Sequence, residues 1–118
     1  MFEILPIPAF KDNYIWLLVR DGRAAVVDPG DAVPVIARLE ALHLQLETIL
    51  ITHHHDDHQG GVEELVARWQ PRVFGPAGES ITGCTDPLSG GETIDVLGQV
   101  VDVLPVGRHT RGHLAYYV

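Results

Sequence analysis

The sequence predicts a mixed β-sheet with helices packed on its outer face, a fold of the α/β or α+β class. Three observations predict it. Strand-like segments near the N-terminus form consecutive hairpins, later strand-like segments alternate with segments of helical periodicity, and residues 46–52 are largely apolar. A largely apolar strand is typical of a sheet that is covered on both faces, and strands that alternate with helices are typical of layered domains.

The first part of the chain is predicted to form three strands and a helix. The strands cover residues 2–7, 14–20 and 24–28. A turn with proline and asparagine joins the first two strands, and Asp21-Gly22 is typical of a hairpin turn between the second and third. A Pro-Gly pair ends the third strand. Asp31 can then cap a helix whose apolar residues follow helical spacing: Val35, Leu39 and Leu42.

The second part of the chain continues the same pattern. Residues 46–52 form the next predicted strand, and a second amphipathic helix starts directly after Gly60-Gly61. The apolar face of this helix contains Val62, Leu65, Val66 and Trp69. Further strands are predicted over residues 72–75, 93–97, 100–106 and 114–118. No linker, repeat or low-complexity segment interrupts the chain, so we expect one domain over residues 1–118.

Composition and charge exclude several classes of protein. The net charge is −8 and the lysine and arginine residues are scattered singly, so no basic patch is available for nucleic acid. No apolar stretch approaches the roughly 20 residues of a membrane span. The N-terminal residues lack the basic region and cleavage site of a signal peptide, and the single cysteine, Cys84, excludes an internal disulfide. We therefore expect a cytoplasmic protein that binds neither nucleic acid nor membrane.

The segment THHHDDHQGG, which follows a predicted strand, carries the main chemical signal. Its potential metal ligands form a His-x-His-x-Asp-His pattern: His53, His55, Asp57 and His58. Imidazole nitrogen and carboxylate oxygen are good ligands for zinc and similar divalent ions. In an extended segment the first two histidines point to the same side, and the last two ligands turn toward a neighbouring position. The spacing predicts two metal ions side by side, with His54 and Asp56 not expected as ligands.

A second histidine cluster, GRHTRGH, follows a later apolar strand. His109 could complete a three-histidine set with His53 and His55, because strand ends from different parts of the chain can meet at one edge of a sheet. His113 is predicted to orient the loop by hydrogen bonds rather than to bind metal. Asp28 ends a strand before the Pro-Gly pair, and two roles stay open for it: a turn cap, or a hydrogen-bond partner of the first histidine segment.

Together these motifs resemble the metallo-β-lactamase superfamily. The resemblance rests on THHHDDHQGG, on VVDPG at residues 26–30 and on HTRGH at residues 109–113. The segment PAFKDNYIW, residues 8–16, is similar to the glyoxalase II (hydroxyacylglutathione hydrolase) family within that superfamily. The similarity extends over essentially the whole chain. It implies an αββα sandwich, of which this chain would be the N-terminal αβ half with a mixed sheet.

The resemblance also implies a two-metal thioesterase. In the family, the residues matching His53, His55 and His109 bind the first metal, and those matching Asp57 and His58 bind the second. A hydroxide that bridges the metals attacks the thioester carbonyl of S-lactoylglutathione, which yields glutathione and D-lactate. Asp57 is the residue of this set that we expect to be catalytic. Two divalent ions are implied as cofactors, with zinc expected and iron or manganese as alternatives.

Two other interpretations stay open. One is a different enzyme of the superfamily, such as a persulfide dioxygenase with a single iron held by His53, His55 and an aspartate from beyond this chain. The other is a metal-binding fragment without turnover. In the family, the bridging aspartate and the last metal-binding histidine lie further along than residue 118. We therefore expect these residues by themselves not to hydrolyse S-lactoylglutathione at an enzymatic rate.

The chain departs from the family at Gly107-Arg108, where the family has Pro-Gly. An arginine side chain obstructs a tight turn, and its positive charge opposes the binding of cations nearby. The double change Gly107→Pro with Arg108→Gly should therefore tighten metal binding, measured by titration against a competing chelator. An unchanged affinity would mean that the loop is already correctly placed or that His109 is not a ligand.

Overall fold

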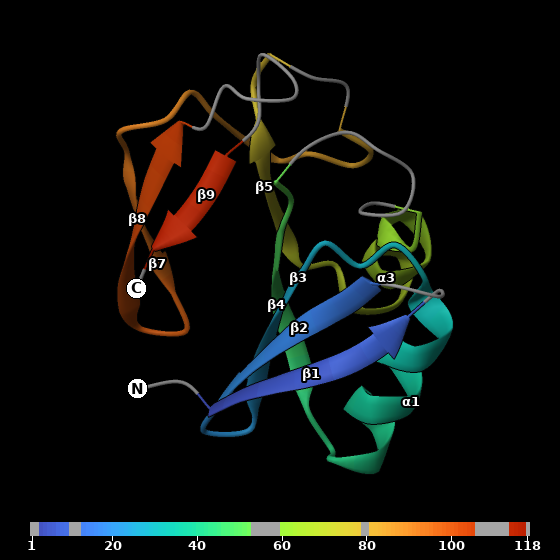
Figure 1. The fold of residues 1–118 in the computed structure, drawn as a ribbon. Coiled ribbons are helices and arrows are strands. Elements are labelled where there is room, and N and C mark those ends of the chain that lie inside the picture. Colours follow the sequence, from blue (N-terminus) through green and yellow to red (C-terminus); the bar gives the residue numbers. More distant parts are fainter. Residues whose placement is uncertain (1–2, 10–12, 53–59, 79–80, 106–113, 118) are drawn as a thin grey trace.

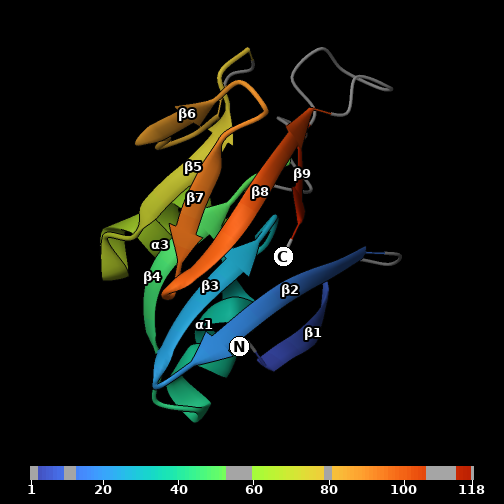
Figure 2. The ribbon, with the colours of Figure 1, turned by 90° about the vertical axis from the view of Figure 1, so that its left-hand side faces the viewer.

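The computed structural model describes residues 3–9, 13–52, 60–78, 81–105 and 114–117. These residues form three layers, with two helices on one face of a large sheet and a small sheet on its other face (Figures 1 and 2). The large sheet contains, in spatial order, β1 (Glu3–Ala9), β2 (Asn13–Arg20), β3 (Arg23–Val27), β4 (Gln45–Leu50), β5 (Arg72–Pro76) and β6 (Asp86–Leu88). The small sheet contains β7 (Thr93–Val96), β8 (Gln99–Pro105) and β9 (Leu114–Tyr117). The helices are α1 (Ala32–Ala41) and α3 (Val62–Trp69).

The large sheet is mixed, as predicted. Strands β1, β2 and β3 are antiparallel neighbours, whereas β3, β4, β5 and β6 run parallel. The predicted hairpin turn at Asp21-Gly22 has φ values of 52° and 76°, the positive values that a two-residue turn between twisted strands requires. The carboxyl ends of the parallel strands lie at one end of the molecule, the upper end in Figure 1, and β8 ends there too.

Two hydrophobic cores hold the layers together, and the central strands contribute to both. On β3, Ala24 and Val26 belong to the core shared with the helices, while Ala25 belongs to the core shared with the small sheet. On β4, Ile49 lies in the first core and Leu50 in the second. All five side chains are buried. Burial on both faces explains why these strands lack the regular polar alternation of a half-exposed sheet.

Both predicted helices are present. Asp31 is the N-cap of α1, and its carboxylate accepts a hydrogen bond from the backbone N–H of Val33 at 3.0 Å, as expected of a cap. Val35 and Leu39 are buried, but the apolar face does not extend to Leu42, which caps the C-terminus and is 46% exposed. No helix in the described part of the chain is long and apolar enough to cross a membrane.

The strands differ from the prediction in three respects. β1 continues through Pro8, which pairs with Tyr14 instead of lying in a connecting turn. Proline is compatible with this position because β1 is an edge strand. β3 and β4 end earlier than predicted, at Val27 and Leu50. β6 was not predicted, because a three-residue strand with proline at its centre shows no alternation.

The small sheet faces the large sheet with one side only. Val101, Val103 and Tyr116 pack in the core between the sheets. Other large apolar side chains of the small sheet remain 44–65% exposed: Val100, Leu104 and Tyr117. Within the described ranges no helix covers that outer face (Figures 1 and 2). The helix, sheet and sheet layers thus correspond to three of the four layers of the predicted αββα sandwich.

Candidate metal centre

The predicted ligands and the histidine predicted to support them lie outside the described residues: His53, His55, Asp57, His58, His109 and His113. Within the described ranges, no group of three or more His, Cys, Asp or Glu side chains could hold a metal ion. The structure instead describes the framework on both sides of each motif. Thr52 and Gly60 flank the first motif, residues 53–59, and Pro105 and Leu114 are the nearest described residues around the second motif, residues 107–113.

Asp28 anchors the end of β4 directly before the first motif. Its φ of 52° lies in the left-handed region and turns the chain out of β3. Its backbone N–H donates to the carbonyl of Leu50 at 2.9 Å. Its carboxylate accepts hydrogen bonds from the backbone N–H of Thr52 at 2.8 Å and from the Thr52 hydroxyl at 2.7 Å. Asp28 therefore fixes both the strand end and the residue that precedes the first predicted ligand.

The same turn holds the far end of the first motif. The backbone N–H of Gly61 donates to the carbonyl of Pro29 at 2.8 Å. Space is so limited that a Cβ atom on Gly61 would lie 2.5 Å from the backbone nitrogen of Ala32 and 2.8 Å from the Pro29 carbonyl oxygen. The chain between Thr52 and Gly61 thus begins and ends at the turn formed by residues 28–32.

Tyr116 connects the small sheet to the end of β4. Its hydroxyl donates to the carbonyl of Ile51 at 2.7 Å, and the backbone N–H of Ile51 donates to the carbonyl of Phe74 on β5 at 2.8 Å. Pro105 at the end of β8 pairs with Leu114 at the start of β9. The chain therefore leaves the small sheet before the second motif and returns to it after the motif at two paired residues. The ends of β4 and β8 lie at the same end of the molecule (Figures 1 and 2).

Burial raises the pKa of two groups in this part of the molecule. Desolvation raises the pKa of the Tyr116 phenol far above its ordinary value, and the negative charge of Asp28 raises it further. A phenol is protonated at neutral pH even at its ordinary pKa, and the hydroxyl of Tyr116 donates to the carbonyl of Ile51. Burial also raises the pKa of the Cys84 thiol, which is the opposite of what an activated cysteine nucleophile requires.

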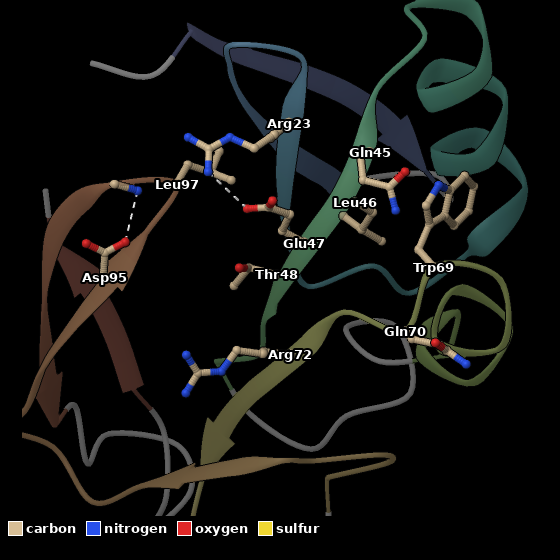
Figure 3. A pocket seen from close by; sticks show the side chains of 11 residues that line it. Arg23, Gln45, Leu46, Glu47, Thr48, Trp69, Gln70, Arg72, Asp95 and Leu97 are labelled. Carbon is tan, nitrogen blue, oxygen red and sulfur yellow. Dashed lines mark hydrogen bonds and ion pairs between the residues drawn. The ribbon is translucent and has the colours of Figure 1, made fainter.

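A separate cleft opens at the opposite ends of the parallel strands. It has a volume of about 410 Å³ and is lined by the first residues of β4, the start of β5 and the β7–β8 hairpin. Figure 3 shows Arg23 facing Glu47, with 3.4 Å between guanidinium and carboxylate, while Asp95 accepts a hydrogen bond from the N–H of Gly98. Open α/β sheets bind ligands beyond the carboxyl ends of their strands, so this cleft lies away from the predicted centre.

The match to known proteins covers nearly the whole chain. Residues 10–118 match the Metallo-beta-lactamase superfamily. The chain belongs to this superfamily. Among its most similar relatives are the hydroxyacylglutathione hydrolases of Dechloromonas aromatica (strain RCB) and Methylobacillus flagellatus, 73% and 54% identical over 99% of this chain. The alignments cover 44% and 48% of these two proteins, so the chain spans about half the length of the curated relatives it matches.

Solved structures of the metallo-β-lactamase fold superpose well on the chain. The BLEG-1 B3 metallo-β-lactamase has a TM-score of 0.84 at 21% identity, over 99% of this chain and 66% of that one. ETHE1 from Myxococcus xanthus has a TM-score of 0.81 at 24% identity, over 98% and 52%. At such identities the likeness bears on the fold alone. The predicted fold and the predicted resemblance to hydroxyacylglutathione hydrolase are confirmed, and membership of the superfamily implies binding of divalent metal.

Sequence reasoning missed the contacts that frame the centre. The sequence pattern predicts a helix directly after Gly60-Gly61, but it does not predict the close contact of Gly61 with the turn after β3. The predicted strand over residues 46–52 includes Thr52, whereas this residue lies beyond the end of β4 and donates two hydrogen bonds to Asp28. Tyr116 lies in a predicted strand, and side chains alternate between the two faces of a strand, so Tyr116 and Tyr117 are predicted to point to opposite faces. That alternation gives no information about which carbonyl a tyrosine reaches.

Gly61→Ala should destabilise the protein by about 2 kcal/mol or more, because the added methyl group meets backbone atoms of the turn that precedes α1. Gly78 is the matched control, since a Cβ atom there meets nothing within 4 Å. Gly78→Ala should change the free energy of unfolding by less than about 1 kcal/mol. Urea unfolding followed by circular dichroism measures both variants. Equal stabilities would show that the close approach at Gly61 does not constrain the fold.

Proposed function

We propose that the chain is the metal-binding part of a thioester hydrolase that converts S-lactoylglutathione and water to glutathione and D-lactate. The names of relatives that are 73% and 54% identical support this assignment, as does the donor pattern of the first motif. The structural observation that carries the proposal is the turn at residues 28–32, which anchors the chain on both sides of that motif. The motif starts beyond the carboxyl end of β4, where α/β sheets place their active sites.

The donor set suits divalent ions. We assign His53, His55 and His109 to one ion, and Asp57 and His58 to a second, with Asp57 as the catalytic residue of the set. Zinc prefers imidazole and carboxylate donors, so zinc is the proposed metal, with iron or manganese as alternatives. Bound ions would lower the pKa of water toward about 7 and stabilise negative charge on the thioester carbonyl oxygen.

Asp28 and His113 are proposed to position the motifs rather than to bind metal. The carboxylate of Asp28 fixes Thr52 through two hydrogen bonds, and the residue after Thr52 is the first proposed ligand, His53. Hydrogen bonds from outside a metal's own ligands orient those ligands and influence metal affinity. These contacts support a role for Asp28 in the centre in addition to its role in the turn. His113 is proposed to orient the second motif by its own hydrogen bonds.

The proposed partner is a glutathione thioester. The acidic net charge of −8 gives no support to nucleic acid as a second partner. Cys84, the free cysteine of the chain, is in keeping with a reducing compartment. The cytoplasm is therefore the proposed site of action.

His55→Ala should weaken zinc binding at least tenfold, whereas His54→Ala should leave it nearly unchanged. The reason is that, of these two histidines, only His55 belongs to the proposed three-histidine set. His54→Ala is a matched control, because it removes the same kind of side chain from the adjacent position. Competition with a chromophoric chelator measures the affinity, and elemental analysis of the purified chain identifies the metal. Equal losses in both variants would overturn the ligand assignment.

The metal and the substrate separate this proposal from the other interpretations. Uptake of two zinc-like ions, with hydrolysis of S-lactoylglutathione by a longer chain containing these residues, supports the hydrolase. A single iron with oxidation of glutathione persulfide would support a dioxygenase instead. Metal binding without either reaction in the longer chain would leave a metal-binding module. The control in each assay is the same chain with His53→Ala and His55→Ala combined.

A further inference from the structure

A single side chain of the small sheet contacts two strands of the large sheet, just beyond the end of β4 and at the middle of β5. Tyr116 is packed in the core between the sheets. Its hydroxyl lies 2.7 Å from the carbonyl oxygen of Ile51 and 3.5 Å from that of Phe74. Ile51 and Phe74 are themselves joined by a backbone hydrogen bond of 2.8 Å. The hydroxyl thus reaches the carboxyl end of β4 beside the middle of β5, where the backbones of the two segments are hydrogen-bonded.

The bond to Ile51 is one that the sheet itself does not supply. β4 ends at Leu50, so the carbonyl of Ile51 lies beyond the strand, although the residue is fully buried. A buried carbonyl requires a donor, and Tyr116 provides one. The following residue, Thr52, is held by Asp28 in the turn after the neighbouring strand β3. Two side chains from different parts of the fold therefore fix consecutive residues at the end of β4.

The hydrogen bond between Tyr116 and Ile51 joins two residues that each lie close in sequence to one of the histidine motifs. Ile51, which accepts this hydrogen bond, precedes His53 by two positions, and Tyr116 follows His109 on the strand that resumes after the second motif. Any shift of β9 relative to β4 would move the two attachment points relative to each other. A hydrogen bond from a buried, protonated phenol opposes such a shift, because breaking it leaves the Ile51 carbonyl without this donor in an apolar core.

We propose that Tyr116 is a positioning residue of the metal centre, which sets the small-sheet motif in register with the motif after β4. This inference rests on the proposed function, since it presumes that both motifs supply ligands. Tyr116 does not touch the metal; it acts through the backbone of Ile51. The consequence is that removal of one hydroxyl group should change how the chain binds metal.

Tyr116→Phe removes the hydroxyl and keeps the ring. We expect zinc affinity to fall about tenfold, the lower range for residues that orient metal ligands, and the visible absorption spectrum of the cobalt-substituted chain to change. Tyr117→Phe is the matched control on the same strand, because Tyr117 is 64% exposed. Asp95→Ala is a second control, since it removes a hydrogen bond from the far end of the small sheet. Wild-type affinity and spectrum in Tyr116→Phe, or losses no larger than in the controls, would overturn the inference.

A measurement on the unaltered chain keeps the test decisive if Tyr116→Phe does not fold. With ¹³C at the tyrosine Cζ position, zinc should shift the Tyr116 resonance and leave that of Tyr117 in place. A Tyr116 resonance unmoved by saturating zinc would overturn the inference.

The failure of this inference is distinguishable from failure of the proposed function. If His55→Ala abolishes zinc binding while Tyr116→Phe binds zinc as the unaltered chain does, only the role of Tyr116 is wrong. If His55→Ala binds zinc normally, the ligand assignment itself fails.

Discussion

At the end of β3 the chain turns through a positive φ at Asp28, and the carboxylate at that turn accepts two hydrogen bonds from Thr52. The carbonyl of the next residue, Pro29, accepts a hydrogen bond from the backbone N–H of Gly61. Two consecutive residues therefore satisfy donors beyond the end of β4 and at the start of α3, where regular hydrogen bonding stops. The positions of the end of β4 and the start of α3 depend on this turn, and a Cβ atom at residue 61 would meet its backbone.

The turn can hold these elements because the strands beneath it are buried on both faces. Ala24 and Val26 face the helical core, and Ala25 faces the small sheet. Small residues at these places allow the layers to approach closely, and dense packing leaves little freedom for β3 to shift. A hydrogen bond from a rigid strand specifies a position, whereas the same bond from a mobile loop would not. The buried sheet is thus the physical basis for precise attachment of the first motif.

The proposed centre combines segments that are far apart in the sequence, so it depends on contacts between layers. The small sheet meets the large one through an apolar core, which is attractive but not directional. Tyr116 adds a directional contact at the edge of that core, because its hydroxyl donates to the carbonyl of Ile51. Apolar packing brings the sheets together, and this hydrogen bond defines their relative position at the end that bears the motifs.

The sequence by itself determined what depends on neighbours along the chain. The hairpin at Asp21-Gly22, the cap at Asp31 and the donor pattern of the first motif follow from local geometry and chemistry, and the last of these also identifies the family. Tertiary structure decided what depends on distant partners. Pro8 lies in a strand because that strand is at an edge, and Tyr116 reaches the carbonyl of a residue 65 positions away. Periodicity specifies the face of a side chain, but the atom that it contacts is set by how the layers pack.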